Sequence, residues 1–349
     1  MNEMLKIADT AYAWPQAWTG ADFDGVEDVA MHLADREVEA LKDCVARAAT
    51  KEVGAIGRAD FAHPDLADLA GRLSQELVHG RGIVVLRGMP VADYSPEEAG
   101  KLFWGLGTQL GKGVSQSALG DLLGHVIDTT KPGEEQSGRG YLSRKELNLH
   151  NDPTELVGLM CYRQGIAGGD SVVTNALSIH NRMREEHPEH LPVLYRGFRY
   201  HRRKEEAEGA APITPYRIPV FSVTEGKLSV FHVREVAQVA LREEGKDFSP
   251  EEVAALDCFR DIANEIAFRF RMEPGDALLL NNYITLHGRT EFENGAEEAG
   301  QRHLLRLWLD VPDGRPKTPH IHIYENKGGA SGIDPQPGRK PAGSEYNVK

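Results

Sequence analysis

Three residues of this chain have the types and the spacing of a mononuclear iron site. His150 and Asp152 are separated by one residue, and His287 lies far downstream. Two imidazoles and one carboxylate can occupy one face of an octahedral metal ion and leave three neighbouring positions open, as in the 2-His-1-carboxylate sites of non-heme Fe(II) oxygenases. The open face can accept a bidentate co-substrate and O2 together. The sequence therefore predicts His150, Asp152 and His287 as iron ligands and catalytic residues.

The segments around these residues can place them at the rim of a β-barrel. In an extended segment, residues i and i+2 point to the same side, so His150 and Asp152 can both face inward. Pro153 follows at once and interrupts regular strand pairing, which sets the pair at a strand end. His287 follows the apolar run 277–280, which a tight turn introduces. A turn, a buried strand and then a histidine would direct this imidazole into a cavity.

Other interpretations of the histidines are open at this stage. A His-X-Asp triplet alone arises by chance in a chain with 14 histidines, and His287 could be a core histidine bonded to a backbone carbonyl. His320 and His322 form a His-X-His pair, but no carboxylate of matching geometry lies nearby, so we expect them at the surface or at a sheet edge. His201 and His232 lie on or beside predicted strands and are further candidate ligands.

Two arginines lie on a predicted strand near the end of the core. Residues 302–311 alternate as a β-strand does, with Arg302, Arg306 and Trp308 on one face, and the apolar remainder predicts burial on both faces. Buried guanidinium groups are costly unless each meets an anion. Because the two lie about 13 Å apart, at about 3.3 Å per residue, they indicate two anionic partners. These could be bound ligands or internal Asp and Glu side chains.

Five short motifs occur in a fixed order within about residues 80–312. They are His150-X-Asp152, Gly168-Gly169-Asp170-Ser171, Pro274-Gly275-Asp276, His287-Gly288-Arg289-Thr290 and Arg302-X3-Arg306. Each motif is weak alone, but the ordered set is specific. Together they resemble the taurine dioxygenase (TauD/TfdA) and clavaminate synthase-like family of Fe(II)- and 2-oxoglutarate-dependent oxygenases.

The resemblance implies a double-stranded β-helix, which is a cupin-like jelly-roll core, with the three residues named first as iron ligands. It implies that Arg302 pairs with the distal carboxylate of 2-oxoglutarate, assisted by Ser171, and that Arg306 meets an acidic group of the primary substrate. The cofactor would be Fe(II), and 2-oxoglutarate and O2 would be co-substrates. The implied reaction couples decarboxylation of 2-oxoglutarate to succinate and CO2 with hydroxylation or a related C–H oxidation.

The remaining pattern favours a mainly β protein with peripheral helices, an α+β chain. Helices are predicted at 34–50, 64–78, 95–106, 177–187 and 250–264. Short strands are predicted at 82–88, 121–128, 145–150, 156–163, 171–175, 195–201, 217–223, 227–233, 276–282 and 302–311. Many short strands with few helices indicate a sandwich or jelly roll. We expect residues 1–79 to be a helical extension packed on the core, residues 80–312 the jelly-roll domain, and residues 313–349 a partly mobile tail.

The composition argues against some classes of binding partner and favours one cellular compartment. The formal net charge of −13 argues against nucleic acid and anionic membranes as partners. Three scattered cysteines indicate neither a disulfide framework nor a zinc cluster, which fits a reducing cytoplasm. Residues 1–18 lack the pattern of a secretory signal, and no apolar run approaches the length of about 20 residues that spans a bilayer. We expect a soluble cytoplasmic protein with a small-molecule substrate, and the sequence leaves open whether it forms a homo-oligomer.

The motifs do not identify the primary substrate. Residues 196–217 are rich in charge and predict either a mobile lid over the active site or a solvated loop, and residues 131–141 could be a second flexible loop. If the basic half of the first segment faces inward with Arg306, the substrate is anionic or amino-acid-like. Desaturation, cyclisation and C–S or C–P cleavage are open as outcomes. Two rival classes also stay open: a catalytically idle jelly-roll module that binds a small anion, and a cupin-like metal enzyme that works without 2-oxoglutarate.

Overall fold

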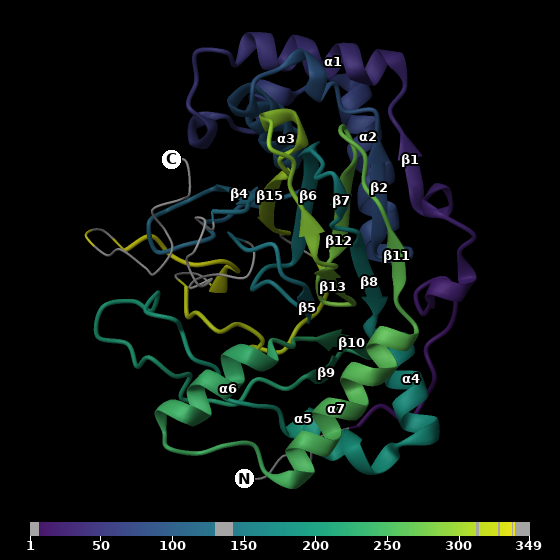
Figure 1. The fold of residues 1–349 in the computed structure, drawn as a ribbon, viewed down its shortest axis with the longest axis vertical. Helices are drawn as coiled ribbons and strands as arrows, with labels where there is room; N and C mark the ends of the chain where they lie inside the picture. The colour runs from purple at the N-terminus through teal and green to yellow at the C-terminus, as the bar shows by residue number, and fades with distance from the viewer. Residues whose placement is uncertain (1–6, 130–141, 312–313, 327–328, 337, 339–349) are drawn as a thin grey trace.

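Two β-sheets form the centre of the molecule. The computed structural model describes residues 7–129, 142–311, 314–326, 329–336 and 338. The larger sheet has the strand order β1-β2-β12-β6-β15-β3, with β4 also paired to β15. Its strands are β1 (Ala30–His32), β2 (Ile83–Arg87), β12 (Ala277–Asn281), β6 (Leu156–Arg163), β15 (His303–Asp310), β3 (Lys112–Gly113) and β4 (Leu123–Ile127). The sheets lie between helices α1–α3 at one end of the molecule and α4–α7 at the other (Figure 1).

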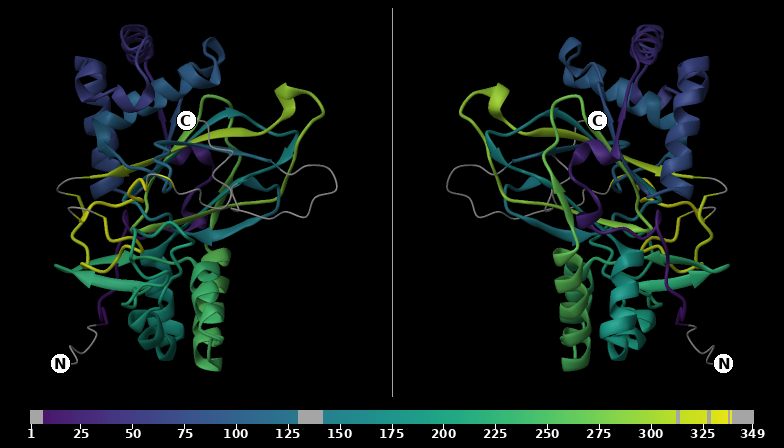
Figure 2. Two further views of the ribbon diagram at one scale, coloured as in Figure 1. Left: turned by 90° about the vertical axis from the view of Figure 1, so that its left-hand side faces the viewer. Right: turned by 90° about the vertical axis from the view of Figure 1, so that its right-hand side faces the viewer.

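The second sheet carries the segment expected to hold the metal. Its order is β11-β8-β13-β5, and its strands are β11 (Phe268–Phe270), β8 (Ser171–Asn175), β13 (Thr285–Arg289) and β5 (Leu147–His150). Two smaller pairs lie beside it, namely β7 (Ala167–Gly168) with β14 (Phe292–Glu293), and the predicted hairpin of β9 (Phe221–Thr224) with β10 (Lys227–Val230). The views of Figure 2 show the strands between the two groups of helices, as expected for a mainly β protein with peripheral helices.

Strand β15 is buried on both faces, as its sequence predicts. Leu305, Leu307 and Leu309 pack in one apolar cluster with the N-terminal helices α1 (Asp35–Arg47), α2 (Pro64–Ser74) and α3 (Pro96–Leu110). Leu304 and Trp308 belong to the other cluster, which also includes residues of the second sheet and the remaining helices. The alternation of side chains along the strand therefore divides the core into two layers.

The second group of helices comprises α4 (Ala176–Glu186), α5 (Leu191–Arg196), α6 (Arg234–Glu243) and α7 (Pro250–Glu265). Helices α3 and α7 begin as predicted, because Ser95 and Ser249 each accept a hydrogen bond from the backbone of the third helical residue, whose glutamate side chain reaches back. A π-helical turn, Gln75–His79, extends α2. None of the helices in the described part of the chain is both long and apolar enough to cross a membrane.

One predicted strand does not form. Residues 195–201 are not a strand: α5 ends at Arg196, and Phe198 and His201 form only isolated bridges. Gly197 breaks the segment with a φ of +67°, where a side chain would strike the backbone of Ile218. The strand predicted at 276–282 stops earlier, at Asn281. After a turn the chain starts β13 in the other sheet, so His287 lies within a strand of its own.

A buried histidine away from the cavity should make the fold sensitive to acid. His180 on α4 is fully buried and lies 2.9 Å from Tyr195 Oη. Burial, together with the nearby Arg184, lowers the pKa of His180 from 6.5 to about 4. At pH 5 the unfolded chain therefore binds a proton here that the folded chain does not. The free energy of unfolding should fall by about 2 kcal/mol between pH 7 and pH 5 because of this residue.

His180→Gln tests this expectation, since glutamine can place a nitrogen near the position of Nε2 but does not titrate. Urea unfolding at the two pH values should show a smaller loss of stability for the variant than for the wild type. The same pH dependence in both proteins would contradict the assignment.

Candidate metal centre and co-substrate site

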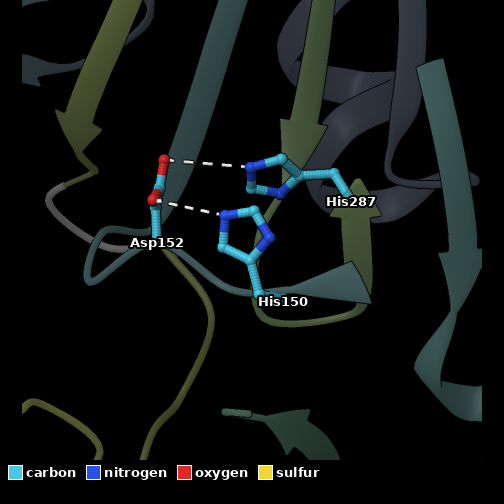
Figure 3. A group of neighbouring side chains, drawn as sticks. All are labelled: His150, Asp152 and His287. Atoms are coloured by element: carbon cyan, nitrogen blue, oxygen red, sulfur yellow. Dashed lines mark ion pairs between the residues drawn. The ribbon is translucent and has the colours of Figure 1, made fainter. Parts of the chain in front are cut away.

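His150, Asp152 and His287 come together at the end of the second sheet. His150 ends β5 and is the register partner of His287 on β13, and Asp152 lies in the loop directly after β5. His150 Nε2 is 3.8 Å from Asp152 Oδ1, and His287 Nε2 is 3.8 Å from Asp152 Oδ2 (Figure 3). One ligand atom of each residue lies within 4.8 Å of the others. Two imidazoles and a carboxylate thus converge on a space that suits a divalent cation.

The surroundings of the two imidazoles favour metal binding, and for His150 a hydrogen bond at Nδ1 leaves Nε2 to face the metal. His150 Nδ1 lies 2.8 Å from the carbonyl oxygen of Asn148. A carbonyl only accepts hydrogen bonds, so Nδ1 carries the proton and Nε2 keeps its lone pair. Burial, with His150 nearby, lowers the pKa of His287 to about 3, so this imidazole is neutral at pH 7. A neutral imidazole is the form that coordinates metals.

The Asp152 carboxylate is held in its ionised form by residues of β15. Burial acts to raise the pKa of Asp152, but the positive charge of Arg306, together with a hydrogen bond from Trp308, outweighs burial, and the pKa is lowered. Arg306 Nη1 lies 3.2 Å from Asp152 Oδ2, and Trp308 Nε1 donates to the same oxygen at 2.8 Å. One of the two anionic partners predicted for the arginines is therefore an internal aspartate.

Arg302 is a buried cation that no anionic side chain of the described residues contacts. It lies just before β15, which begins at His303. The pairing of β15 with β6 is irregular between His303 and Leu304. The prediction of one regular strand from residue 302 was therefore wrong at its first residue. The side chain is 4% exposed, and its Nε and Nη1 have no hydrogen-bond partner among the described residues. Burial, with Arg289 nearby, lowers its pKa to about 9, which leaves it charged at pH 7.

The surroundings of Arg302 fit a carboxylate ligand. A buried guanidinium is costly until it meets an anion, and a carboxylate can accept two parallel hydrogen bonds from it. Gly169 has a φ of +75°, and a β-carbon there would lie 2.9 Å from Arg302 Nε, so only glycine allows the approach. Phe292 stacks beneath the guanidinium, with its ring centre 5.2 Å from Cζ. The described residues thus surround Arg302 with a glycine backbone and an aromatic ring and supply no anion to its Nε and Nη1.

Ser171 lies on the same sheet as His287. On β8, Val173 is the register partner of His287, and Ser171 is the partner of Arg289. Because paired residues point to the same face, Ser171 and His287 share one face and are separated by two steps along the strand, about 7 Å. Ser171 is buried. Ser171 therefore lies on the same face of this sheet as His287, and its role beside the distal carboxylate stays a prediction.

The rival histidines do not join the three residues. His320 is exposed and stacks on Tyr216, and His322 is only partly buried. His201 Nε2 pairs with Glu243 at 2.7 Å. Among the described residues, the group of His150, Asp152 and His287 is the one set of three with the spacing of metal ligands.

A cavity of about 420 Å³ opens beside the three residues. Its wall includes His150 and Asp152 and comes from five parts of the chain: β5 with the residues on either side of it, the segment near residue 204, the start of α6, strand β15, and the chain beyond β15. Contributions that the sequence did not reveal are Glu146, Val233, Glu235, Val236, Ile323, Tyr324 and Ile333. No local pattern marks them, because distant segments bring them together only in the fold.

A jelly-roll core that carries two histidines, a carboxylate and a buried arginine defines the class of non-heme Fe(II)- and 2-oxoglutarate-dependent dioxygenases. The chain belongs to the taurine catabolism dioxygenase TauD, TfdA family, whose model matches residues 44–308. The double-stranded β-helix core, the enzyme class and the requirement for Fe(II) and 2-oxoglutarate are thereby confirmed.

Curated relatives agree with this membership. The chain is 32% identical to FR-33289 synthase of Streptomyces rubellomurinus (strain ATCC 31215) over 271 residues, which is 75% of this chain and 79% of the relative. It is 27% identical to the taurine hydroxylase-like protein SAT17 of Stachybotrys chartarum (strain CBS 109288 / IBT 7711) over 310 residues, 83% of this chain and 77% of the relative.

Solved structures agree in fold. Asparagine oxygenase in complex with Fe(II), 2S,3S-3-hydroxyasparagine and succinate has a TM-score of 0.64 at 16% identity, covering 88% of this chain and 99% of that one. The non-heme iron oxygenase OrfP in complex with Fe and alpha-ketoglutaric acid has a TM-score of 0.59 at 15% identity, covering 81% and 94%.

Proposed function

We propose that His150, Asp152 and His287 hold Fe(II), that Arg302 with Ser171 holds the distal carboxylate of 2-oxoglutarate, and that the enzyme hydroxylates a small amino-acid-like molecule. The observation that carries the proposal is the buried Arg302, whose Nε and Nη1 have no partner among the described residues. It belongs to the same β-sheet core as the three residues whose ligand atoms converge. A dianion with one carboxylate at the metal and the other at Arg302 satisfies both requirements.

Bound together, Fe(II) and 2-oxoglutarate supply the oxidising power, since O2-dependent decarboxylation to succinate and CO2 is coupled to oxidation of a substrate C–H bond. The residues of the chain orient the metal ligands and supply the charge that a bound carboxylate needs. The Asn148 carbonyl holds the His150 ring, Arg306 and Trp308 hold the Asp152 carboxylate, and the guanidinium of Arg302 neutralises a carboxylate inside the core.

The charges around the cavity support a zwitterionic substrate. Arg203 and Arg306 lie on its wall together with Glu205 and Glu235, and apolar side chains fill much of the remainder. A volume of about 420 Å³ falls in the range of small-molecule sites. The two structural neighbours were solved with hydroxylated amino acids, hydroxyasparagine in one and hydroxy-L-Arg in the other. An ammonium group beside the glutamates and a carboxylate beside an arginine would match this wall.

The charged segment predicted as a lid forms part of this wall. Arg202 is buried, and its Nε donates to the carbonyl of Ile323 at 2.9 Å, so the segment is tied to the chain beyond β15. Arg203 and Lys204 both adopt left-handed backbone conformations, with φ of 56° and 63°, which cost energy for residues other than glycine and concentrate at functional sites. Closure of this wall over the substrate stays a prediction, and residues 131–141 lie outside the described residues.

An anaerobic titration of the apo-protein with Fe(II) and 2-oxoglutarate tests the assignment. We expect the weak visible charge-transfer band of the iron chelate. Iron binding without the band would favour the cupin-like metal enzyme, and no iron binding would favour the anion-binding module.

The substrate class is tested by succinate release in the presence of each of the twenty standard L-amino acids, taurine or γ-butyrobetaine. We expect stimulation by at least one amino acid. Glu235→Gln should then raise its KM about tenfold or more, because a charged hydrogen bond of about 1.5–3 kcal/mol is lost. Glu225→Gln, on the exposed β9–β10 turn, is the control. No stimulation by any amino acid, with the band intact, would contradict the substrate class alone.

A further inference from the structure

The Asp152 carboxylate is held by two residues that alternate on one strand. Arg306 Nη1 contacts both of its oxygens, at 3.2 and 3.4 Å, and Trp308 Nε1 donates to Oδ2 at 2.8 Å. All three side chains are buried. A buried indole N–H needs a hydrogen-bond acceptor, and here the acceptor is the carboxylate that faces both candidate imidazole ligands.

Arg306 is itself held in place. Its Nε donates to Gln116 Oε1 at 2.8 Å, and Gln116 Nε2 donates to the backbone oxygen of Arg306 at 2.8 Å. A β-carbon at Gly124, the register partner of Arg306 on β4, would lie 2.7 Å from Gln116 Oε1. The guanidinium also stacks on the Trp308 ring, 4.7 Å from its centre. The orientation of the carboxylate is therefore fixed by a packed arrangement rather than by one contact.

Arg306 also lies on the cavity wall, so the substrate contact that the resemblance implies stays a prediction, and the contact with Asp152 is a second role. A guanidinium that contacts both oxygens of an internal carboxylate fixes the orientation of that carboxylate. Partners that orient a metal ligand typically change metal affinity by about 10- to 100-fold when they are removed. Arg306 and Trp308 contact the Asp152 carboxylate in the way that such orienting partners do.

We propose that Arg306 and Trp308 are positioning residues of the metal centre, which fix the Asp152 carboxylate and thereby set the affinity for the metal ion. The proposal rests on the proposed assignment of Asp152 as an iron ligand. It gives Arg306 a task that is complete before any primary substrate binds.

Trp308→Phe tests the proposal because it removes the indole N–H and keeps an aromatic ring. The apo-protein is titrated anaerobically with Fe(II), and separately with Co(II), without 2-oxoglutarate and without turnover. We expect affinity for both ions to fall by about 10- to 100-fold. Trp104→Phe is the matched control. The buried Trp104 Nε1 also donates a hydrogen bond, but its acceptor is the backbone oxygen of Ile56, at 2.9 Å, and not a candidate metal ligand. This control variant should bind both ions as the wild type does.

Arg306→Gln separates positioning from substrate recognition. Weaker metal binding in this variant, in the absence of any substrate, supports the proposal. Unchanged metal affinity in both Arg306→Gln and Trp308→Phe overturns it, and a rise only in the KM of a stimulating amino acid would make Arg306 a substrate receptor. A wild-type protein that binds neither ion would instead overturn the proposed function, so the two failures are distinguishable.

Discussion

Asp152→Ala should abolish iron binding and succinate formation. The substitution removes the negatively charged member of the three ligands, and it also removes the carboxylate that lies 3.2 Å from the guanidinium of Arg306 in the wild type. Breaking a buried pair in this way costs about 3–5 kcal/mol. Without the carboxylate, only two imidazoles remain to bind the cation, and the positive charge of Arg306 lies beside them, so we expect Fe(II) affinity to fall by at least two to three powers of ten.

The measurement is an anaerobic Fe(II) titration followed by succinate detection, with circular dichroism to show that the variant is folded. His320→Ala is the matched control, because His320 belongs to the rival His-X-His pair and is exposed. The control should bind iron and turn over normally. Full turnover by Asp152→Ala, or loss of iron from the control, would contradict the ligand assignment.

The sequence predicted the features that depend only on the types and spacing of neighbouring residues. The i, i+2 spacing of His150 and Asp152 and the strong start signals of α3 and α7 depend only on neighbouring residues, and the structure contains them. Helix α6 was missed for a related reason: it begins after Val233, which provides no side-chain cap. A short helix without a start signal leaves little for a local rule to detect.

Long-range pairing explains what the sequence could not provide. The position of His287 opposite His150 depends on β13 joining the second sheet, and a strand of five residues that contains a glycine and a histidine has no apolar signature. The cavity wall combines Arg203 with Tyr324, about 120 residues apart in the chain. A pattern along one segment can show which way a side chain points but not what it meets.

Arg306 on β15 and Arg302 just before it illustrate this limit. Both were expected to meet anions, and internal partners and bound ligands were equally open. Arg306 meets Asp152, whereas Arg302 has Nε and Nη1 without a partner in the described part of the chain. The difference arises from a break in regular pairing at His303 and from the space that Gly169 leaves, and neither is visible before the strands are assembled.

Arg302→Ala should raise the KM for 2-oxoglutarate by about 100-fold or more while leaving Fe(II) binding intact. The reason is that a carboxylate buried against this guanidinium would lose charge-assisted hydrogen bonds of about 1.5–3 kcal/mol each, in a place where water cannot easily replace them. Because Arg302 without a ligand is itself an unfavourable buried charge, the alanine variant should be no less stable than the wild type.

The KM is measured by succinate release, and the charge-transfer band is followed anaerobically in the same variants. Arg302→Lys should recover only part of the affinity, since an ammonium group keeps the charge but not the planar fork. Arg269→Ala removes an exposed arginine from β11 and should leave both readouts unchanged. A normal KM for 2-oxoglutarate in Arg302→Ala would mean that another group holds the distal carboxylate, and it would contradict the role assigned to Arg302.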